Sequence, residues 1–156
     1  MIRLINSKDF SNFFTFMSGD SSLTTQDIKK MFNKCIKHGD KSFMYEEVSK
    51  IQGILLIRKD DIKKSLSIFA DNTIANHLIK YMTWNVYEPL TVTTKKYSPL
   101  VKLFNKFSYN KFKADKFNLS GFQFVGVKEK DITFNFIPSK KENYNRFIKE
   151  EDKNDN

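Results

Sequence analysis

Apolar residues recur along this chain with two different spacings. In some stretches they return every three or four positions, which is typical of an amphipathic helix. In others they alternate with polar residues or run together, which is typical of strands. The expected strands are residues 2–5, 42–48, 52–58, 65–70, 90–94, 122–127 and 132–137. With helices expected to begin near Ser7, Thr24, Asp71 and Ser98, the order is β-α-α-β-β-β-α-β-α-β-β.

That order predicts an α/β (α+β) fold: a mixed, mostly antiparallel central sheet with helices on its faces. The length of 156 residues fits one domain, and we expect it to occupy residues 1–138. The polar tail, residues 139–156, is expected to be partly disordered.

The second helix has the clearest local signals. Thr24 is followed three residues later by Asp27, as in a capping box, and Gly39 stands where a helix often ends on glycine. The apolar residues between them recur at helical spacing: Ile28, Met31, Phe32, Cys35 and Ile36. Cys35 is the only cysteine, so an intramolecular disulfide and a cysteine-based zinc cluster are excluded. The two histidines have no clustered carboxylates beside them, so we expect no metal site.

The formal charge of +9 makes this a basic protein. Attraction to nucleic acid, to an anionic cofactor or to acidic proteins is one interpretation. The other is codon bias, since Phe, Lys, Asn and Ile are all abundant. The longest apolar run, residues 54–57, is far shorter than the ~20 residues that span a bilayer, and no signal-peptide pattern is seen. A cytoplasmic protein without membrane partners is therefore expected.

Two stretches carry a family resemblance. Residues 45–57 read as a hairpin whose second strand opens at a glycine, Gly53. Residues 90–94 form a strand, a helix follows and ends at residues 103–107, and a Gly-Phe pair opens a final hairpin at Gly121. The order resembles the GNAT superfamily of N-acetyltransferases, with an apparent insertion of about a dozen residues before the Gly-Phe pair.

The resemblance implies transfer of an acyl group from acetyl-CoA, or another acyl-CoA, to an amine on a small molecule or a protein. The cofactor would bind where the third strand of the meander ends and the next helix begins, because free amides there suit a diphosphate. The implied cofactor-binding residues are Ile68, Phe69, Ala70, Asn72, Thr73, Ala75 and Asn76. The family's first glycine and the basic or amide residue before it are missing, so this chain is a divergent member with a degenerate motif. Asp71 is interpreted as a helix N-cap.

The implied catalytic residues also depart from the family pattern. Phe104 stands where the family often has a tyrosine that protonates the leaving thiolate, and phenylalanine has no proton to give. Tyr97 and Ser98 lie nearby in the sequence and could substitute, and we take Tyr97 as the candidate; Tyr97 also fits a plain aromatic residue beside a helix. Glu46 is the expected general base for the amine, although Glu46 and Glu47 also fit plain solvent-facing strand positions.

Residues 95–117 form a second candidate surface, which we call the lysine-aromatic arm. Its lysines include Lys111, Lys113 and Lys116, interleaved with aromatic residues, a combination that many proteins use to hold nucleic acid. The aromatic residues could equally pin an insertion onto the core. The alternative function is therefore a catalytically inactive GNAT-like binding module, which contacts nucleic acid or a protein through this arm. The sequence does not indicate an oligomeric state.

Overall fold

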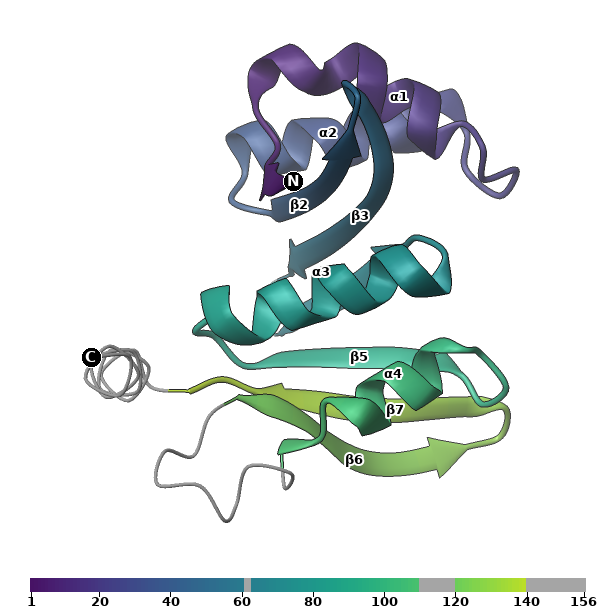
Figure 1. Ribbon diagram of the computed structural model, residues 1–156. Coiled ribbons are helices and arrows are strands. Elements are labelled where there is room, and N and C mark those ends of the chain that lie inside the picture. Colours follow the sequence, from purple (N-terminus) through teal and green to yellow (C-terminus); the bar gives the residue numbers. More distant parts are fainter. Residues whose placement is uncertain (61–62, 110–119, 140–156) are drawn as a thin grey trace, which may run out of the picture. The chain divides into compact units, whose positions relative to one another are not determined.

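The computed structural model describes residues 1–60, 63–109 and 120–139 (Figure 1). The chain forms two compact units, Met1–Leu78 and Ile79–Asn156. Helix α3 begins in the first unit and ends in the second. Within the described residues, no helix is both long and apolar enough to cross a membrane.

The first unit builds an antiparallel sheet in the order β1-β2-β3-β4. Its elements are β1 (Ile2–Leu4), the 3-10 helix η1 (Ser7–Asp9), α1 (Phe10–Met17), α2 (Thr25–Lys37), β2 (Lys41–Glu47), β3 (Lys50–Lys59), β4 (Lys64–Phe69) and the start of α3 (Asn72–Asn85). Along β3, Ile54 and Leu56 point to one face of the sheet, where they pack with Phe13 and Met17 of α1 and Ile28 of α2. This face therefore holds the core between the sheet and the first two helices.

Helix α2 confirms the local signals read from the sequence. The Thr24 hydroxyl accepts a hydrogen bond from the Asp27 amide at 3.1 Å, and the Asp27 carboxylate accepts one from the Thr24 amide at 2.9 Å. These two bonds satisfy amides that a helix otherwise leaves free at its start. After the helix, Gly39 has a φ of 85°, a conformation that glycine adopts without steric cost.

The first helical segment begins at Ser7, as expected. Asn6 caps it, because its side chain accepts from the Lys8 amide at 2.9 Å and Asp9 completes the capping box. The inner face of α3 consists of Ala75, Leu78, Ile79 and Met82, which are buried. Asn85, the last residue of the helix, is exposed.

The second unit holds β5 (Leu90–Lys95), α4 (Leu100–Lys106), β6 (Gly121–Lys128) and β7 (Asp131–Ile137). Its strands pair antiparallel in the order β5-β7-β6. The ring of Phe104 on α4 is fully buried, 4.7 Å from the Phe122 ring and 5.3 Å from the Phe134 ring, centroid to centroid. Aromatic contacts of this kind add to the stabilisation that burial of the rings already gives. Phenylalanines thus build the core between α4 and the sheet.

The end of α4 and the start of β6 lie together although the chain between them is long. The Phe122 amide donates to the Phe107 carbonyl at 2.8 Å, and Ser108 forms an isolated bridge with Phe122. The apparent insertion, residues 110–119, lies outside the described residues. The predicted Gly-Phe pair therefore lies beside the end of the helix in space. In the family pattern the pair follows the helix directly in the sequence.

The prediction of a mixed, mostly antiparallel α/β fold is confirmed. All seven predicted strands are present in the described part of the chain, with ends that differ by a few residues. The assignment of residues 1–138 to one domain stays a prediction. The predicted tail lies, apart from Ser139, outside the described residues.

Candidate functional site

The predicted cofactor stretch joins β4 to α3 within the first unit. Ile68 and Phe69 end β4 and pair with Leu55 and Ile54 of β3. Ala70 and Asp71 make the connection, and α3 begins at Asn72. Ile68, Phe69 and Ala70 are all partly exposed, and Phe69 also packs against the core of the first unit.

Asp71 is the N-cap of α3, as predicted. Its carboxylate accepts a hydrogen bond from the Ile74 amide at 2.9 Å, and its carbonyl accepts one from the Ala75 amide at 2.8 Å. The amides of Asn72 and Thr73 have no acceptor among the described residues. They are exposed at the positive end of the helix dipole, which is the general requirement for binding a phosphate group. The carboxylate of Asp71 reduces that attraction.

The other two predicted cofactor residues lie further along α3. Ala75 is fully buried against the core, so its small side chain serves packing in this structure. Asn76 is half-buried on the neighbouring face. Whether these seven residues bind a cofactor stays a prediction.

Gly53 allows α3 to approach β3 closely. A Cβ atom at Gly53 would lie 2.5 Å from Cγ2 of Ile74, 2.9 Å from Cβ of Ala70 and 3.3 Å from a methyl of Leu78. Non-bonded carbon atoms do not approach to 2.5 or 2.9 Å. The start of α3 can therefore lie this close to β3 only because Gly53 has no side chain. The glycine quoted for the family resemblance therefore has a packing role beside the candidate cofactor stretch.

The variant Gly53→Ala should lower the free energy of unfolding by about 1–3 kcal/mol, because the added methyl forces α3 or its side chains to move. Urea unfolding followed through the fluorescence of Trp84 measures the change. Gln52→Ala, at the exposed neighbouring position, is the control and should change stability by less than about 0.5 kcal/mol. Equal effects of the two variants would contradict the packing role.

Glu46, the predicted base, is held in an ion-pair network. Its Oε2 atom lies 2.8 Å from Nε of Arg3. The two terminal nitrogens of the same guanidinium donate to the two carboxylate oxygens of Asp9, each at 2.8 Å. Arg3 thus links β1, η1 and β2, and Glu46 has a structural partner where it was expected to face solvent or substrate. Its role as a base stays a prediction.

Tyr97, the predicted acid, lies in the turn between β5 and α4 and is 73 % exposed. It belongs to the second unit, whereas Glu46 belongs to the first. Phe104, at the position where the resemblance places a tyrosine, fills the core between α4 and the sheet. A hydroxyl at Phe104 would need a partner inside that core, which explains physically why phenylalanine suits this position.

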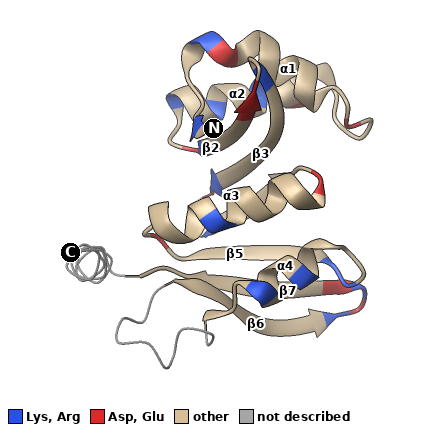
Figure 2. Cartoon of the chain, viewed as in Figure 1, with Lys and Arg blue, Asp and Glu red and all other residues tan. Residues whose placement is uncertain are grey.

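The lysine-aromatic arm is described only in part. Lys95 makes an ion pair with Asp131 at 2.8 Å, and the Lys106 ammonium lies 5.5 Å from the centroid of the Phe107 ring. Figure 2 shows basic positions on α4 and along α2. Lys111, Lys113 and Lys116 lie outside the described residues, so the proposed nucleic-acid contact stays a prediction. No comparison or contact favours that alternative.

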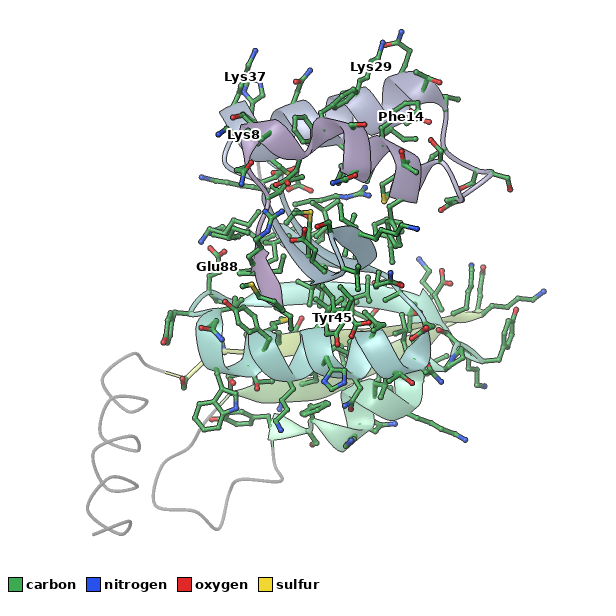
Figure 3. All side chains as sticks on the ribbon, turned by 45° about the horizontal axis from the view of Figure 1, so that its top comes forward. Lys8, Phe14, Lys29, Lys37, Tyr45 and Glu88 are labelled. Carbon is green, nitrogen blue, oxygen red and sulfur yellow. The ribbon has the colours of Figure 1, made fainter. Side chains whose placement is uncertain are left out.

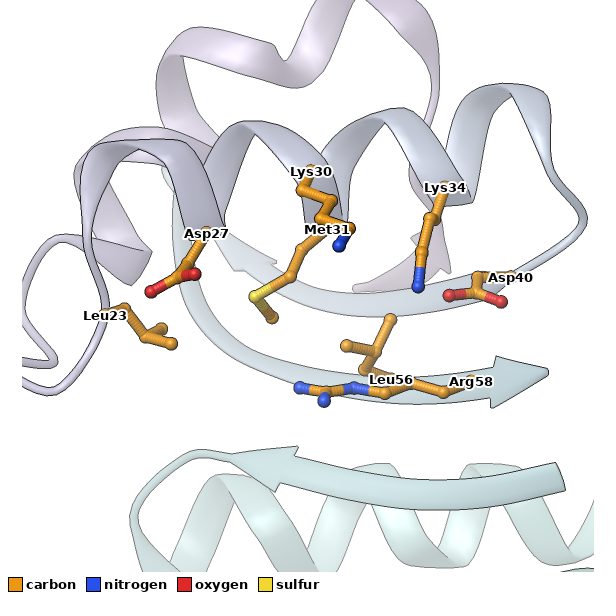
Figure 4. Close-up of a pocket in the computed structure, with 8 residues that line it drawn as sticks. All are labelled: Leu23, Asp27, Lys30, Met31, Lys34, Asp40, Leu56 and Arg58. Atoms are coloured by element: carbon orange, nitrogen blue, oxygen red, sulfur yellow. The ribbon is translucent and has the colours of Figure 1, made fainter. Parts of the chain in front are cut away.

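A cavity of about 380 Å³ between α2 and β3 was not predicted from the sequence (Figure 4). Its lining combines three cations, two carboxylates and three apolar side chains: Lys30, Lys34, Arg58, Asp27, Asp40, Leu23, Met31 and Leu56. The spacing of Lys30 and Lys34 places them on one side of α2, a signal present in the sequence. That Arg58 lies in the same cavity as these lysines depends on the packing of α2 against β3. The spacing of residues in the sequence does not reveal this contact.

Cys35 carries the one thiol of the chain. Burial raises the pKa of the Cys35 thiol to about 12, with a further contribution from the charge of Asp40, so the thiol is protonated at neutral pH. A protonated, half-buried thiol is a poor nucleophile. In the parts of the chain that the structure describes, no three His, Cys, Asp or Glu side chains gather as a metal-binding group.

Comparison with solved structures identifies the architecture. An acetyltransferase of the GNAT family from Streptococcus pneumoniae superposes with a TM-score of 0.56 at 20% identity, covering 87% of this chain and 96% of that one. The chain has the GNAT fold. The ribosomal-protein-alanine N-acetyltransferase from Brucella melitensis gives a TM-score of 0.57 at 13% identity, covering 88% and 99%.

A third GNAT-like structure carries a cofactor. It is the N-acetyltransferase PseH from Campylobacter jejuni in complex with acetyl coenzyme A, with a TM-score of 0.50, 15% identity and coverage of 86% and 97%. By sequence, no family model and no curated protein matches this chain. At these identities, the comparisons show that the GNAT fold is shared.

Proposed function

We propose that this protein is an N-acyltransferase that takes an acyl group, most simply acetyl, from acyl-CoA to an amine. The observation that carries the proposal is the junction of β4 and α3 within the GNAT fold. There, partly exposed strand residues lead directly into a helix start whose Asn72 and Thr73 amides are free among the described residues. Of the GNAT-fold proteins compared above, PseH is one whose solved structure holds acetyl-CoA.

The reaction would proceed by direct attack of the amine. The neutral nitrogen forms a C–N bond with the thioester carbonyl carbon, the C–S bond breaks, and one proton passes from nitrogen to the thiolate to give free CoA. Such a step needs a deprotonated amine, a positioned thioester and a donor for the carbonyl oxygen. The backbone of Ile68, Phe69 and Ala70 would position the thioester and supply the donor.

The proton transfers are assigned to Glu46 and Tyr97 as part of the same proposal. Glu46 would have to exchange its contact with Arg3 for the acceptor amine, because one carboxylate oxygen is already bound to that guanidinium. The side chain of Tyr97 is largely exposed and so open to a thiolate. A phenolic hydroxyl can protonate a thiolate, since it is a donor at neutral pH.

Binding of acetyl-CoA is the first test. At a hundredfold excess over its dissociation constant, the cofactor should raise the free energy of unfolding by about 2.7 kcal/mol, which thermal unfolding detects. No rise in melting temperature with saturating acetyl-CoA would overturn the proposed function. Isothermal titration calorimetry then gives the affinity directly.

The variant Thr73→Asp tests where the cofactor binds. A carboxylate in the first turn of α3 suits the helix dipole, so the fold should hold, but it would repel the diphosphate. We expect at least tenfold weaker binding of acetyl-CoA. Thr25→Asp is the matched control, since Thr25 is an exposed first-turn residue of α2, and it should leave the affinity unchanged. Equal affinities of both variants and the wild type would place the diphosphate elsewhere.

A further inference from the structure

The cavity between α2 and β3 lies on the same face of the first unit's sheet as the α1 and α2 core. Leu56 belongs to that core and also lines the cavity. In the sheet, Leu56 pairs with Ser67 of β4, and Ile54 pairs with Phe69, where the candidate thioester stretch lies. Since paired residues and residues two apart share a face, Phe69 and Leu56 point to the same side. Leu56 in the cavity wall is thus one strand and two residues along the sheet from Phe69, the last residue of β4.

Among the described residues, the cations of the cavity make no ion pair or hydrogen bond. No carboxylate among the described residues lies within ion-pair distance of Lys30, Lys34 or Arg58. Figure 4 shows the two lysines reaching down from α2 while the Arg58 side chain extends along β3. By contrast, Lys29 and Lys37 of the same helix point outward (Figure 3).

The two carboxylates of the lining already have hydrogen-bond donors. Asp40 is buried and accepts from the Lys59 amide at 2.9 Å, and Asp27 accepts from the Thr24 amide at 2.9 Å within the capping box. Both hold the backbone of the cavity wall. With three cations against two carboxylates, the lining keeps a net positive charge, and its free donors all belong to Lys and Arg.

We propose that this cavity binds the anionic end of the acceptor: a small amine that also carries a carboxylate or a phosphate. Arg58 offers the planar pair of donors that fits either group, and Lys30 and Lys34 add charge. Met31 and Leu56 provide an apolar surface for the carbon chain between the anion and the amine. A volume of about 380 Å³ is in the range of small-molecule sites. This assignment rests on the proposed function, because the amine would extend toward the end of β4.

The test uses the full chain with acetyl-CoA and four amines: 4-aminobutanoate, O-phosphoethanolamine, butylamine and 1,4-diaminobutane. Release of the CoA thiol is followed with a thiol reagent. We expect kcat/KM to be at least tenfold higher for an amine with an anionic group than for butylamine or the diamine. The rates with 4-aminobutanoate and O-phosphoethanolamine show whether a carboxylate or a phosphate is preferred. No preference for either anionic amine would overturn the inference.

Variants locate the effect. Arg58→Gln should reduce kcat/KM for the preferred anionic amine about tenfold, without changing the affinity for acetyl-CoA or the rate with butylamine. Lys37→Gln, on the outward side of α2, is the control and should leave all three unchanged. An Arg58→Gln protein that is as active with the anionic amine as the wild type would contradict the site.

A separate binding measurement distinguishes the two hypotheses. Calorimetry with 4-aminobutanoate and O-phosphoethanolamine, without acetyl-CoA, should show binding that Arg58→Gln weakens at least fivefold. If acetyl-CoA does not bind but this Arg58-dependent binding is seen, the transferase proposal fails and the anion site stands. If acetyl-CoA binds but neither anionic amine binds or reacts preferentially, the anion site fails alone.

Discussion

The variant Gly121→Ala should lower the free energy of unfolding by about 3 kcal/mol or more. A Cβ atom there would lie 2.5 Å from both N and Cα of Tyr109 and 2.8 Å from the carbonyl carbon of Ser108. These are backbone atoms, so no rotation of a side chain relieves the overlap. The segment after α4 would have to separate from β6, with loss of the bond from Phe122 to the Phe107 carbonyl.

Gly126→Ala is a matched control on the same strand. Nothing lies within 4 Å of a Cβ atom built at Gly126, so this variant should change stability by less than about 1 kcal/mol. Urea titrations of both variants, followed by circular dichroism, give the comparison. Two equal losses would show that alanine is disfavoured in β6 generally and that the approach of Tyr109 is unimportant.

Local signals in the sequence were sufficient to predict the helices and strands. The capping box of Thr24 and Asp27 and the glycine at Gly39 were read correctly, because every atom involved lies within a few residues. The strands were found because burial of alternate positions leaves its period in the sequence. The element order then identified the GNAT fold, although the comparison structures share 20% or less of their residues with this chain.

Features that depend on contacts between distant parts of the chain could not be predicted from local signals. Glu46 was taken for a free strand carboxylate because Arg3, its partner, stands 43 positions earlier in the chain. Asn6 and Ser7 are both of residue types that cap helices, and only the bond from the Lys8 amide identifies Asn6 as the cap. Arg58 shows the same limit, since its proximity to α2 follows from the packing of a helix onto a sheet.

The variant Asp9→Asn should lower the free energy of unfolding by about 3 kcal/mol, because it breaks the ion pair with Arg3 that holds the first residues of the chain. The Asp9 side chain is only 7% exposed and takes three hydrogen bonds of 2.8 Å, two from Arg3 and one from the Asn6 amide. An amide has one oxygen where the carboxylate has two. The guanidinium of Arg3 would therefore keep Glu46 but lose its paired acceptors.

The loss should depend on pH in a defined direction. The hydrogen bonds from Arg3, with a smaller contribution from the Asn6 amide, hold the pKa of Asp9 below its usual value, against the opposing effect of burial. A carboxyl whose pKa is lower in the folded state contributes stability above the unfolded pKa of about 3.9, and loses it as the pH falls through the folded value. The difference between wild type and Asp9→Asn should be constant from pH 8 to about pH 5 and shrink below about pH 4.

Asp131→Asn is the control for this prediction, because it removes a carboxylate from an ion pair of the same 2.8 Å length whose side chains are 64% and 46% exposed. Water already solvates both of those groups, so the expected loss is below about 1 kcal/mol at any pH. Urea unfolding of both variants at pH 7, 5 and 3.5 makes the comparison. If Asp9→Asn costs no more than Asp131→Asn at pH 7, or if its cost is unchanged at pH 3.5, the Arg3–Asp9 pair does not stabilise the first unit, and the N-terminal strand is held by its backbone bonds to β2 alone.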